Sequence, residues 1–225
     1  MNQEFKKNYQ IHTKKTLNEQ VYDSLKQMMI DDVLKPSQKL NETDIADVLG
    51  VSATPVREAF KRLAAEGFVE IIPYKGVYVR EYTITELKEV YQCREQLELL
   101  ALDLAFPNIE ESDIDNLIDD LITYKNSKDL STSVDLSNML HDYIIEKSNN
   151  KRLKMLLDHL NDVIVRDRNI TAGDECRKMQ IHEEHIDILR SMKAKNLEES
   201  KLYLSKHIKN GFKYIENQIS NNNKD

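Results

Sequence analysis

The sequence has few residues that interrupt regular secondary structure, and they are unevenly placed. It contains only five glycines and four prolines in 225 residues. Seven of these nine residues lie within positions 1–107, and no proline follows Pro107. Because proline and glycine mark turns and hairpins, the segment 108–225 excludes a turn-rich β-sandwich or an α/β fold with many loops. The distribution predicts a mixed N-terminal part followed by a long all-helical part.

The sequence also lacks a disulfide framework, a secretory signal and a long apolar run. Cys93 and Cys176 form no CxxC motif, which indicates free thiols in a reducing compartment. The first ten residues have no apolar core, so they do not form a signal peptide. No apolar run approaches the ~20 residues that span a bilayer. We therefore expect a cytoplasmic protein without membrane contact.

The negative charge is concentrated in the second part of the chain. The formal net charge is −7. Residues 1–80 contain 12 Lys and Arg against 11 Asp and Glu, whereas residues 81–225 contain 20 against 28. This distribution argues against a uniformly basic protein that coats nucleic acid. It still allows a local basic face in the first part, because DNA interacts with a face and not with the total charge.

Residues 1–80 predict three helices and a β-hairpin after a basic tail over 1–15. Apolar spacing and turn residues predict helices over 17–34, 43–49 and 55–66 and strands over 68–72 and 77–80. Pro36 is expected to end the first helix, and Gly50 fits a left-handed cap after the second. This order is that of a winged helix-turn-helix. In that fold the helix after the turn, here 55–66, enters the DNA major groove.

The same segment resembles a known family. LGVSATPVREAFKRLAAEGFV, followed by PYKGVYV, is similar to the DNA-binding domain of GntR-type transcriptional regulators. The resemblance implies DNA contacts from the start of the recognition helix and from the wing, at Thr43, Ser52, Thr54, Pro55, Arg57, Lys75 and Gly76. Ala53 stands where most relatives have an arginine that commonly reads guanine, so the operator need not match the usual consensus.

Arg57 is the residue of this set with the strongest chemical reason to bind DNA. A guanidinium one turn into the recognition helix can pair with a base edge or a phosphate. The alternative is a surface residue paired with Glu58 or Glu66. Ser52 and Thr54, with the amides at the helix start, suit phosphate oxygens.

Residues 81–225 predict an antiparallel bundle of about six helices. Thr83 and Glu86 form a capping-box pattern after a short linker over 81–85, and Pro107 ends the helix that begins there. Five further stripes of apolar residues at helical spacing follow. We expect the bundle to occupy 86–219 and the polar segment 220–225 to be frayed.

This bundle resembles the FCD ligand-binding domain of the FadR subfamily. The resemblance implies a metal site at His141, His185 and His207, with Ser137 at the position where metal-binding members carry an Asp. Three imidazoles with open coordination positions suit a divalent transition metal, zinc or nickel above all. A lone histidine on an apolar face is usually a hydrogen-bonded core residue, but three at these positions favour a metal.

Arg94 lies on an apolar stripe of the first bundle helix, and a buried arginine needs a partner. One alternative is an internal ion pair with Glu98 or Glu95. The other, which the resemblance implies, is a clamp for a carboxylate effector beside the metal, to which Ser137 also contributes.

The favoured function is a repressor that binds a palindromic operator as a homodimer and responds to a small carboxylate metabolite bound with a metal. Two alternatives remain at this point: a sensor of the metal ion alone, and a metal-dependent enzyme. The enzyme is disfavoured because no general base accompanies the histidines and a DNA-reading domain would serve no purpose.

Overall fold

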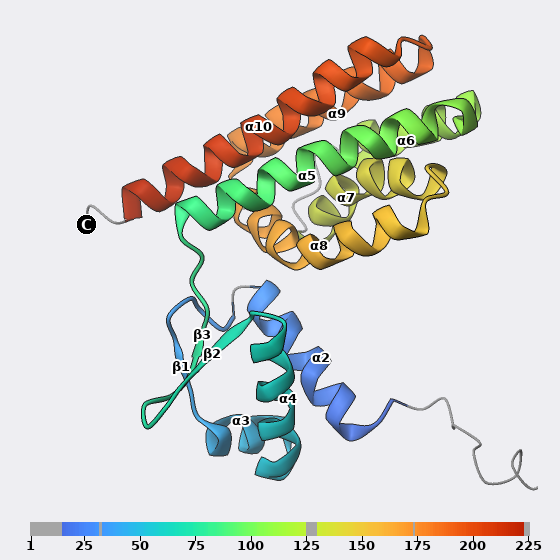
Figure 1. Cartoon of the computed structure of the whole chain (residues 1–225). Helices are drawn as coiled ribbons and strands as arrows, with labels where there is room; N and C mark the ends of the chain where they lie inside the picture. The colour runs from blue at the N-terminus through green and yellow to red at the C-terminus, as the bar shows by residue number, and fades with distance from the viewer. Residues whose placement is uncertain (1–14, 32, 125–129, 173, 223–225) are drawn as a thin grey trace, which may run out of the picture. The chain divides into compact units, whose positions relative to one another are not determined.

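The computed structural model describes residues 15–31, 33–124, 130–172 and 174–222. Within these ranges it does not describe the side chains of 124, 130–137, 161–162 and 165–172. The chain divides into two compact units, Met1–Glu81 and Tyr82–Asp225 (Figure 1). Most of the basic tail over 1–15 lies outside the described residues.

The first helix, α2 (Leu17–Ile30), begins at a capping box and ends earlier than its apolar pattern predicts. The Thr16 hydroxyl accepts from the Glu19 amide, while the Glu19 carboxylate accepts from the Thr16 amide. After Ile30 the chain folds back, and the amides of Val33 and Leu34 both donate to the Met28 carbonyl. Pro36 therefore does not end the helix, because the chain has already turned.

Helices α3 (Glu42–Leu49) and α4 (Ala53–Ala65) form the helix-turn-helix. Gly50 connects them at φ 65°, in the left-handed region that glycine adopts with little strain. One core cluster joins the three helices to the sheet, with Leu25, Val56, Phe60 and Leu63 at most 1% exposed. This packing fixes the direction in which α4 presents its first turn.

The sheet has three strands where the sequence predicts a hairpin. β2 (Val69–Ile72) and β3 (Gly76–Val79) pair antiparallel, and β1 (Lys39–Leu40) pairs with the other edge of β3, giving the order β1-β3-β2. β1 was missed because two residues carry no alternating pattern. Leu40 is 4% exposed and anchors the strand in the core.

Six helices form the second unit over its described residues, as predicted. They are α5 (Ile84–Ala105), α6 (Glu111–Tyr124), α7 (Leu130–Lys147), α8 (Lys151–Ala172), α9 (Glu175–Lys193) and α10 (Leu197–Asn222). A 3-10 turn over Phe106–Asn108 follows α5, and Thr83 and Glu86 form the predicted capping box. α10 continues to Asn222, three residues into the segment expected to fray, and 223–225 lie outside the described residues.

The bundle core lies where α10 packs against α9 and α5, and where α5 packs against α7 (Figure 1). Leu102, Ile114, Leu189, Met192 and Leu204 have no exposed surface. No helix in the described part of the chain is long and apolar enough to cross a membrane. The same core also holds polar residues, and these define the candidate site described below.

The left-handed turn at Gly50 gives a stability prediction. A Cβ at this position would meet no atom within 4 Å, so Gly50→Ala adds backbone strain without a clash. We expect Gly50→Ala to lower the free energy of local unfolding of α4 by about 1 kcal/mol. Amide hydrogen exchange on the full chain measures this free energy. Gly211→Ala is the matched control, because Gly211 has no positive φ and its added Cβ would make only ordinary contact with Tyr91. Equal protection of α4 in both variants would contradict the prediction.

Candidate functional site

The start of α4 presents two exposed polar side chains and is not capped by a side chain. Ser52 occupies the N-cap position with extended backbone, but its hydroxyl makes no capping hydrogen bond. The side chains of Ser52 and Thr54 are exposed. A helix start of this kind offers backbone amides and the positive end of the helix dipole to a phosphate.

Arg57 is held on the surface by a carboxylate of the preceding helix. Its Nε donates to Oε1 of Glu42 at 3.2 Å and its Nη2 donates to Oε2 at 2.6 Å. This partner is neither Glu58 nor Glu66, the two alternatives that sequence spacing offers. The Arg57 side chain remains 54% exposed, so the ion pair is a weak surface interaction that a phosphate or a base edge can replace.

The wing tip carries one expected cation and two residues that sequence reasoning missed. Lys75 is exposed in the β2–β3 turn, and Gly76 follows at φ 118°. A Cβ on Gly76 would come within 3.1 Å of Cε of Lys39, so β1 brings a second lysine against the wing. Tyr74 is fully exposed at φ 64°. The short β1 strand left no sequence signal for Lys39.

Two members of the expected DNA-contact set have structural roles. Pro55 is buried in the first turn of α4, so its ring is not available at the surface. The Thr43 hydroxyl donates to Oδ1 of Asn41 at 2.8 Å beside the N-cap of α3, and the side chain remains exposed. Thr43 can therefore still contact a DNA backbone, whereas Pro55 contributes through the helix start.

The three predicted histidines converge in the interior of the second unit. His141 comes from α7, His185 from α9 and His207 from α10, and they are 2%, 0% and 6% exposed. Nε2 of His207 lies 3.3 Å from Nε2 of His141 and 3.3 Å from Nε2 of His185. One ligand atom from each residue lies within 4.8 Å of the other two, so the cluster could hold a metal ion.

Carboxylates determine which nitrogen of two of these rings carries the proton. Nδ1 of His141 lies 2.5 Å from Oε2 of Glu98, and Nδ1 of His207 lies 2.7 Å from Oε2 of Glu184. An ionised carboxylate only accepts hydrogen bonds, so each Nδ1 carries the proton and donates it. The Nε2 lone pairs of His141 and His207 then face each other at 3.3 Å with no proton between them.

This arrangement fits a divalent metal. Two lone pairs at hydrogen-bond distance repel unless a cation lies between them. Ligands at about 2.0–2.1 Å from a tetrahedral zinc ion are about 3.3 Å apart, which matches the separations of Nε2 of His207 from Nε2 of His141 and of His185. Neutral imidazoles that donate Nδ1–H to a carboxylate are the usual form of metal-ligating histidines.

The protonation states support the same arrangement. Burial raises the pKa of Glu184, but the hydrogen bonds and charges of His207 and Arg177 outweigh it and hold that pKa at about 2. Burial lowers the pKa of His207, although Glu184 opposes this effect. Glu184 is therefore an anion and His207 a neutral imidazole near pH 7, the form in which its Nε2 can bind a metal.

Arg94 makes the internal ion pair that was one of its two predicted roles. It is 3% exposed, and its Nε donates to Oε1 of Glu98 at 2.6 Å. Its Nη2 lies 3.5 Å from Nε2 of His141, at the edge of the histidine cluster. Arg94 therefore lies at the histidine cluster, and its Nε is already bound to Glu98.

Ser137 lies on α7 four residues before His141, but its side chain is outside the described part of the chain.

Sequence reasoning missed the two carboxylates beside the histidines, the buried Glu98 and the partly buried Glu184. Glu184 directly precedes His185 but reaches His207, because its own α9 packs against α10. Arg177 reaches the same carboxylate, with Nη1 3.1 Å from Oε1. Helical spacing can predict the contact of Glu184 with Arg177, two turns away on α9. No pattern along the chain predicts its contact with His207 on another helix.

Two matches to family models cover most of the chain. The model described as "Bacterial regulatory proteins, gntR family" matches residues 17–79, and the model of the FCD domain matches residues 89–210. The chain belongs to the GntR family of bacterial regulatory proteins. Its FCD domain assigns it to the FadR subfamily, as the resemblance implied.

Curated relatives of this GntR-family chain are regulators. It is 28% identical over 204 residues to the HTH-type transcriptional regulator YdhC of Bacillus subtilis, covering 89% of this chain and 91% of YdhC. It is 28% identical over 183 residues to the Nta operon transcriptional regulator of Aminobacter aminovorans, covering 80% and 86%. The solved structure of McbR/YncC of E. coli has the same fold, with a TM-score of 0.74 at 24% identity, covering 92% of this chain and all of the other. These families and relatives are transcription regulators and not enzymes.

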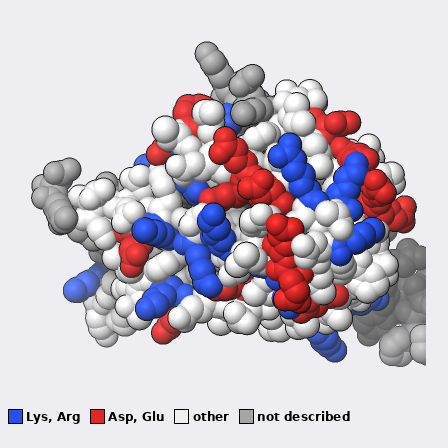
Figure 2. All heavy atoms as spheres, turned by 90° about the horizontal axis from the view of Figure 1, so that it is seen from above, with Lys and Arg blue, Asp and Glu red and all other residues white. Residues whose placement is uncertain are grey.

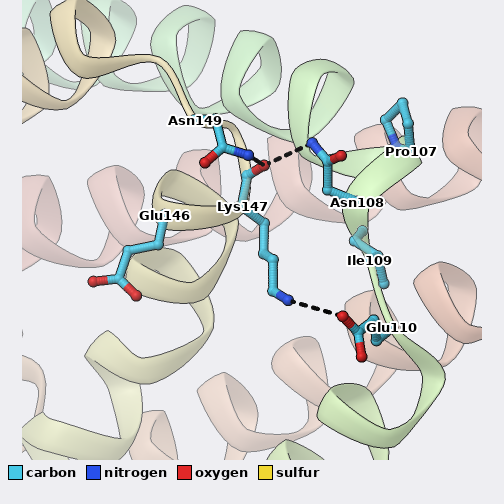
Figure 3. Close-up of a pocket in the computed structure, with 7 residues that line it drawn as sticks. All are labelled: Pro107, Asn108, Ile109, Glu110, Glu146, Lys147 and Asn149. Carbon is cyan, nitrogen blue, oxygen red and sulfur yellow. Dashed lines mark hydrogen bonds and ion pairs between the residues drawn. The ribbon is translucent and has the colours of Figure 1, made fainter.

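The surface of this GntR-family chain does not expose the histidines. An open pocket of about 520 Å³ lies at the end of α7 (Figure 3), and its lining contains none of the three. There the side-chain amides of Asn108 and Asn149 donate to the Lys147 carbonyl. In the face shown in Figure 2, the described Lys and Arg residues are interspersed with Asp and Glu.

The Arg94–Glu98 pair gives a second prediction. Removing one partner leaves the other charge buried, so Arg94→Met should lower the free energy of unfolding by about 3 kcal/mol or more. The double variant Arg94→Met with Glu98→Met should lose clearly less than the sum of the single losses, because no uncompensated charge remains. Denaturant unfolding of the full chain measures all three values. Additive losses would show that the pair is not coupled.

Proposed function

We propose that this GntR-family regulator binds a palindromic operator as a homodimer, represses from it, and responds to a small carboxylate bound with a divalent metal in the FCD domain. The observation that carries the proposal is the pairing, in one chain, of an exposed recognition-helix start with a buried three-histidine cluster. Such a regulator meets its operator in the bacterial cytoplasm.

The DNA-binding surface that we propose consists of the α4 start and the wing. Arg57 leaves Glu42 to pair with a base edge or phosphate, while Ser52 and Thr54 bind phosphate oxygens. Thr43 contacts the backbone from α3, and Lys75, Gly76 and the exposed Tyr74 approach the minor groove. Because the two-fold symmetry of a homodimer is mirrored in its operator, the expected site is palindromic.

The metal in this proposal is held by His141, His185 and His207, with zinc or nickel as the ion that suits three imidazoles. A bound divalent ion with open coordination positions supplies a Lewis-acid site for a carboxylate oxygen. Nη2 of Arg94 lies 3.5 Å from Nε2 of His141, so the same carboxylate can reach its guanidinium. Ser137, one turn before His141, is proposed to contact the effector.

A sensor of the metal ion alone is the second candidate. It is favoured by the burial of the three histidines, which are at most 6% exposed. In that case DNA affinity would depend on zinc or nickel without any organic ligand. Either effector acts only by binding two conformations of the regulator with different affinity.

The DNA-binding proposal predicts the effect of Arg57→Ala. We expect a loss of about 10- to 100-fold in affinity for DNA from the regulator's own promoter region, because one bidentate contact is removed from an exposed side chain. Electrophoretic mobility shift at fixed ionic strength measures it. Arg152→Ala is the control, because it removes the same charge from an exposed position on α8. Unchanged binding by Arg57→Ala would overturn the recognition-helix assignment.

The metal proposal predicts one zinc or nickel ion per chain. Elemental analysis after purification without chelator or an affinity metal should find the ion in the wild type and not in His207→Ala. Adding zinc at 100 times its Kd should raise the free energy of unfolding of the wild type by about 2.7 kcal/mol. His159→Ala is the matched control, since His159 is exposed on α8. Retention of metal by His207→Ala would contradict the assigned ligands.

A further inference from the structure

Two arginine–glutamate pairs, one buried and one partly buried, lie beside the histidine cluster and contact different histidines. Arg94 pairs with Glu98 on α5, and Glu98 contacts His141 on α7. Arg177 pairs with Glu184 on α9, and Glu184 contacts His207 on α10. Each pair thus joins a helix to the histidine of a neighbouring helix, and neither carboxylate is among the candidate metal ligands.

The Glu184 carboxylate is fixed by three side chains. Oε2 accepts from Nδ1 of His207 at 2.7 Å and from Nη2 of Arg177 at 3.3 Å. Oε1 accepts from Nη1 of Arg177 at 3.1 Å and from the Asn210 amide at 2.7 Å. The Arg177 side chain is 4% exposed and that of Glu184 is 17% exposed, so this fork is a partly buried contact. A carboxylate held from three sides cannot rotate away from His207.

Glu98 occupies the corresponding place at His141. Its side chain is 4% exposed, with Oε1 2.6 Å from Nε of Arg94 and Oε2 2.5 Å from Nδ1 of His141. Its two oxygens are therefore divided between the arginine and the imidazole. The two carboxylates impose the same tautomer on the two histidines whose Nε2 atoms lie 3.3 Å apart.

We propose that Glu98 and Glu184 are positioning residues that, each anchored by a buried arginine, hold His141 and His207 as Nδ1–H tautomers with their Nε2 lone pairs directed at the metal. The inference rests on the proposed metal centre and adds the residues that organise it. The two anions also supply negative charge near the ion in a chain that has Ser137 where related metal sites have a carboxylate. The arginines keep these anions compensated before the metal binds.

Zinc affinity and histidine tautomers of the full chain test this inference. We expect Glu184→Gln and Glu98→Gln each to weaken zinc binding by about 10- to 100-fold, measured by competition with a chromophoric chelator. Glutamine keeps the shape of the side chain, but its amide can donate as well as accept, so it no longer imposes one tautomer. Glu183→Gln is the matched control, because it removes the same charge from the adjacent exposed position.

A second readout is independent of zinc binding by the variants. Nitrogen-15 NMR of metal-free wild type with labelled histidine should show His141 and His207 protonated at Nδ1. In Glu184→Gln the signal of His207 alone should shift toward a mixture of tautomers, and in Glu98→Gln that of His141 alone. If one variant fails to fold, the other and the wild-type spectrum still decide the matter.

The outcomes separate the inference from the function on which it rests. Wild type that binds no zinc would overturn the metal centre, and the positioning role with it. Wild-type zinc binding that is unchanged in both glutamine variants, or a wild-type spectrum with Nε2 protonated in His207, would overturn the positioning role alone. Equal losses in Glu183→Gln and Glu184→Gln would reduce the effect to general charge and also overturn it.

Discussion

Three imidazoles that direct ring nitrogens at one point inside a helical bundle impose the main constraint on this structure. With Nδ1 of His141 and His207 donating to carboxylates, the facing Nε2 atoms cannot hydrogen-bond to each other. The surrounding helices must hold these groups together against that repulsion. The core of α5, α7, α9 and α10 provides this rigidity, because buried leucines and isoleucines pack around the polar cluster.

The buried charges follow from the same constraint. Glu98 and Glu184 lie next to imidazoles in the bundle interior, and an unpaired carboxylate in such a place would be strongly destabilising. Arg94 and Arg177 compensate them within the same helix, at i−4 and at i−7. Each carboxylate is therefore compensated by an arginine of its own helix before a metal binds.

The proposed functional groups of the DNA-binding unit differ from those of the bundle, because they are exposed and make only weak surface contacts. Arg57 is paired with Glu42 on the surface, and Ser52 leaves the first turn of α4 without a side-chain cap. Such groups can exchange their partners for phosphates at little cost. Their positions depend on the separate core of this unit, which includes Phe60 and Leu63, and on the left-handed turn at Gly50.

The sequence by itself determined the order of the elements, because glycine, proline, capping residues and apolar spacing are local signals. It indicated the helix-turn-helix, the wing turn, the start of α5 and the three histidines through the family pattern. The early end of α2, the strand β1 and the partner of Arg57 were decided only by tertiary structure, since each depends on contacts between distant segments. Glu98 and Glu184 were decided there too: along the chain they are two among 39 acidic residues, and only helix packing brings them against His141 and His207.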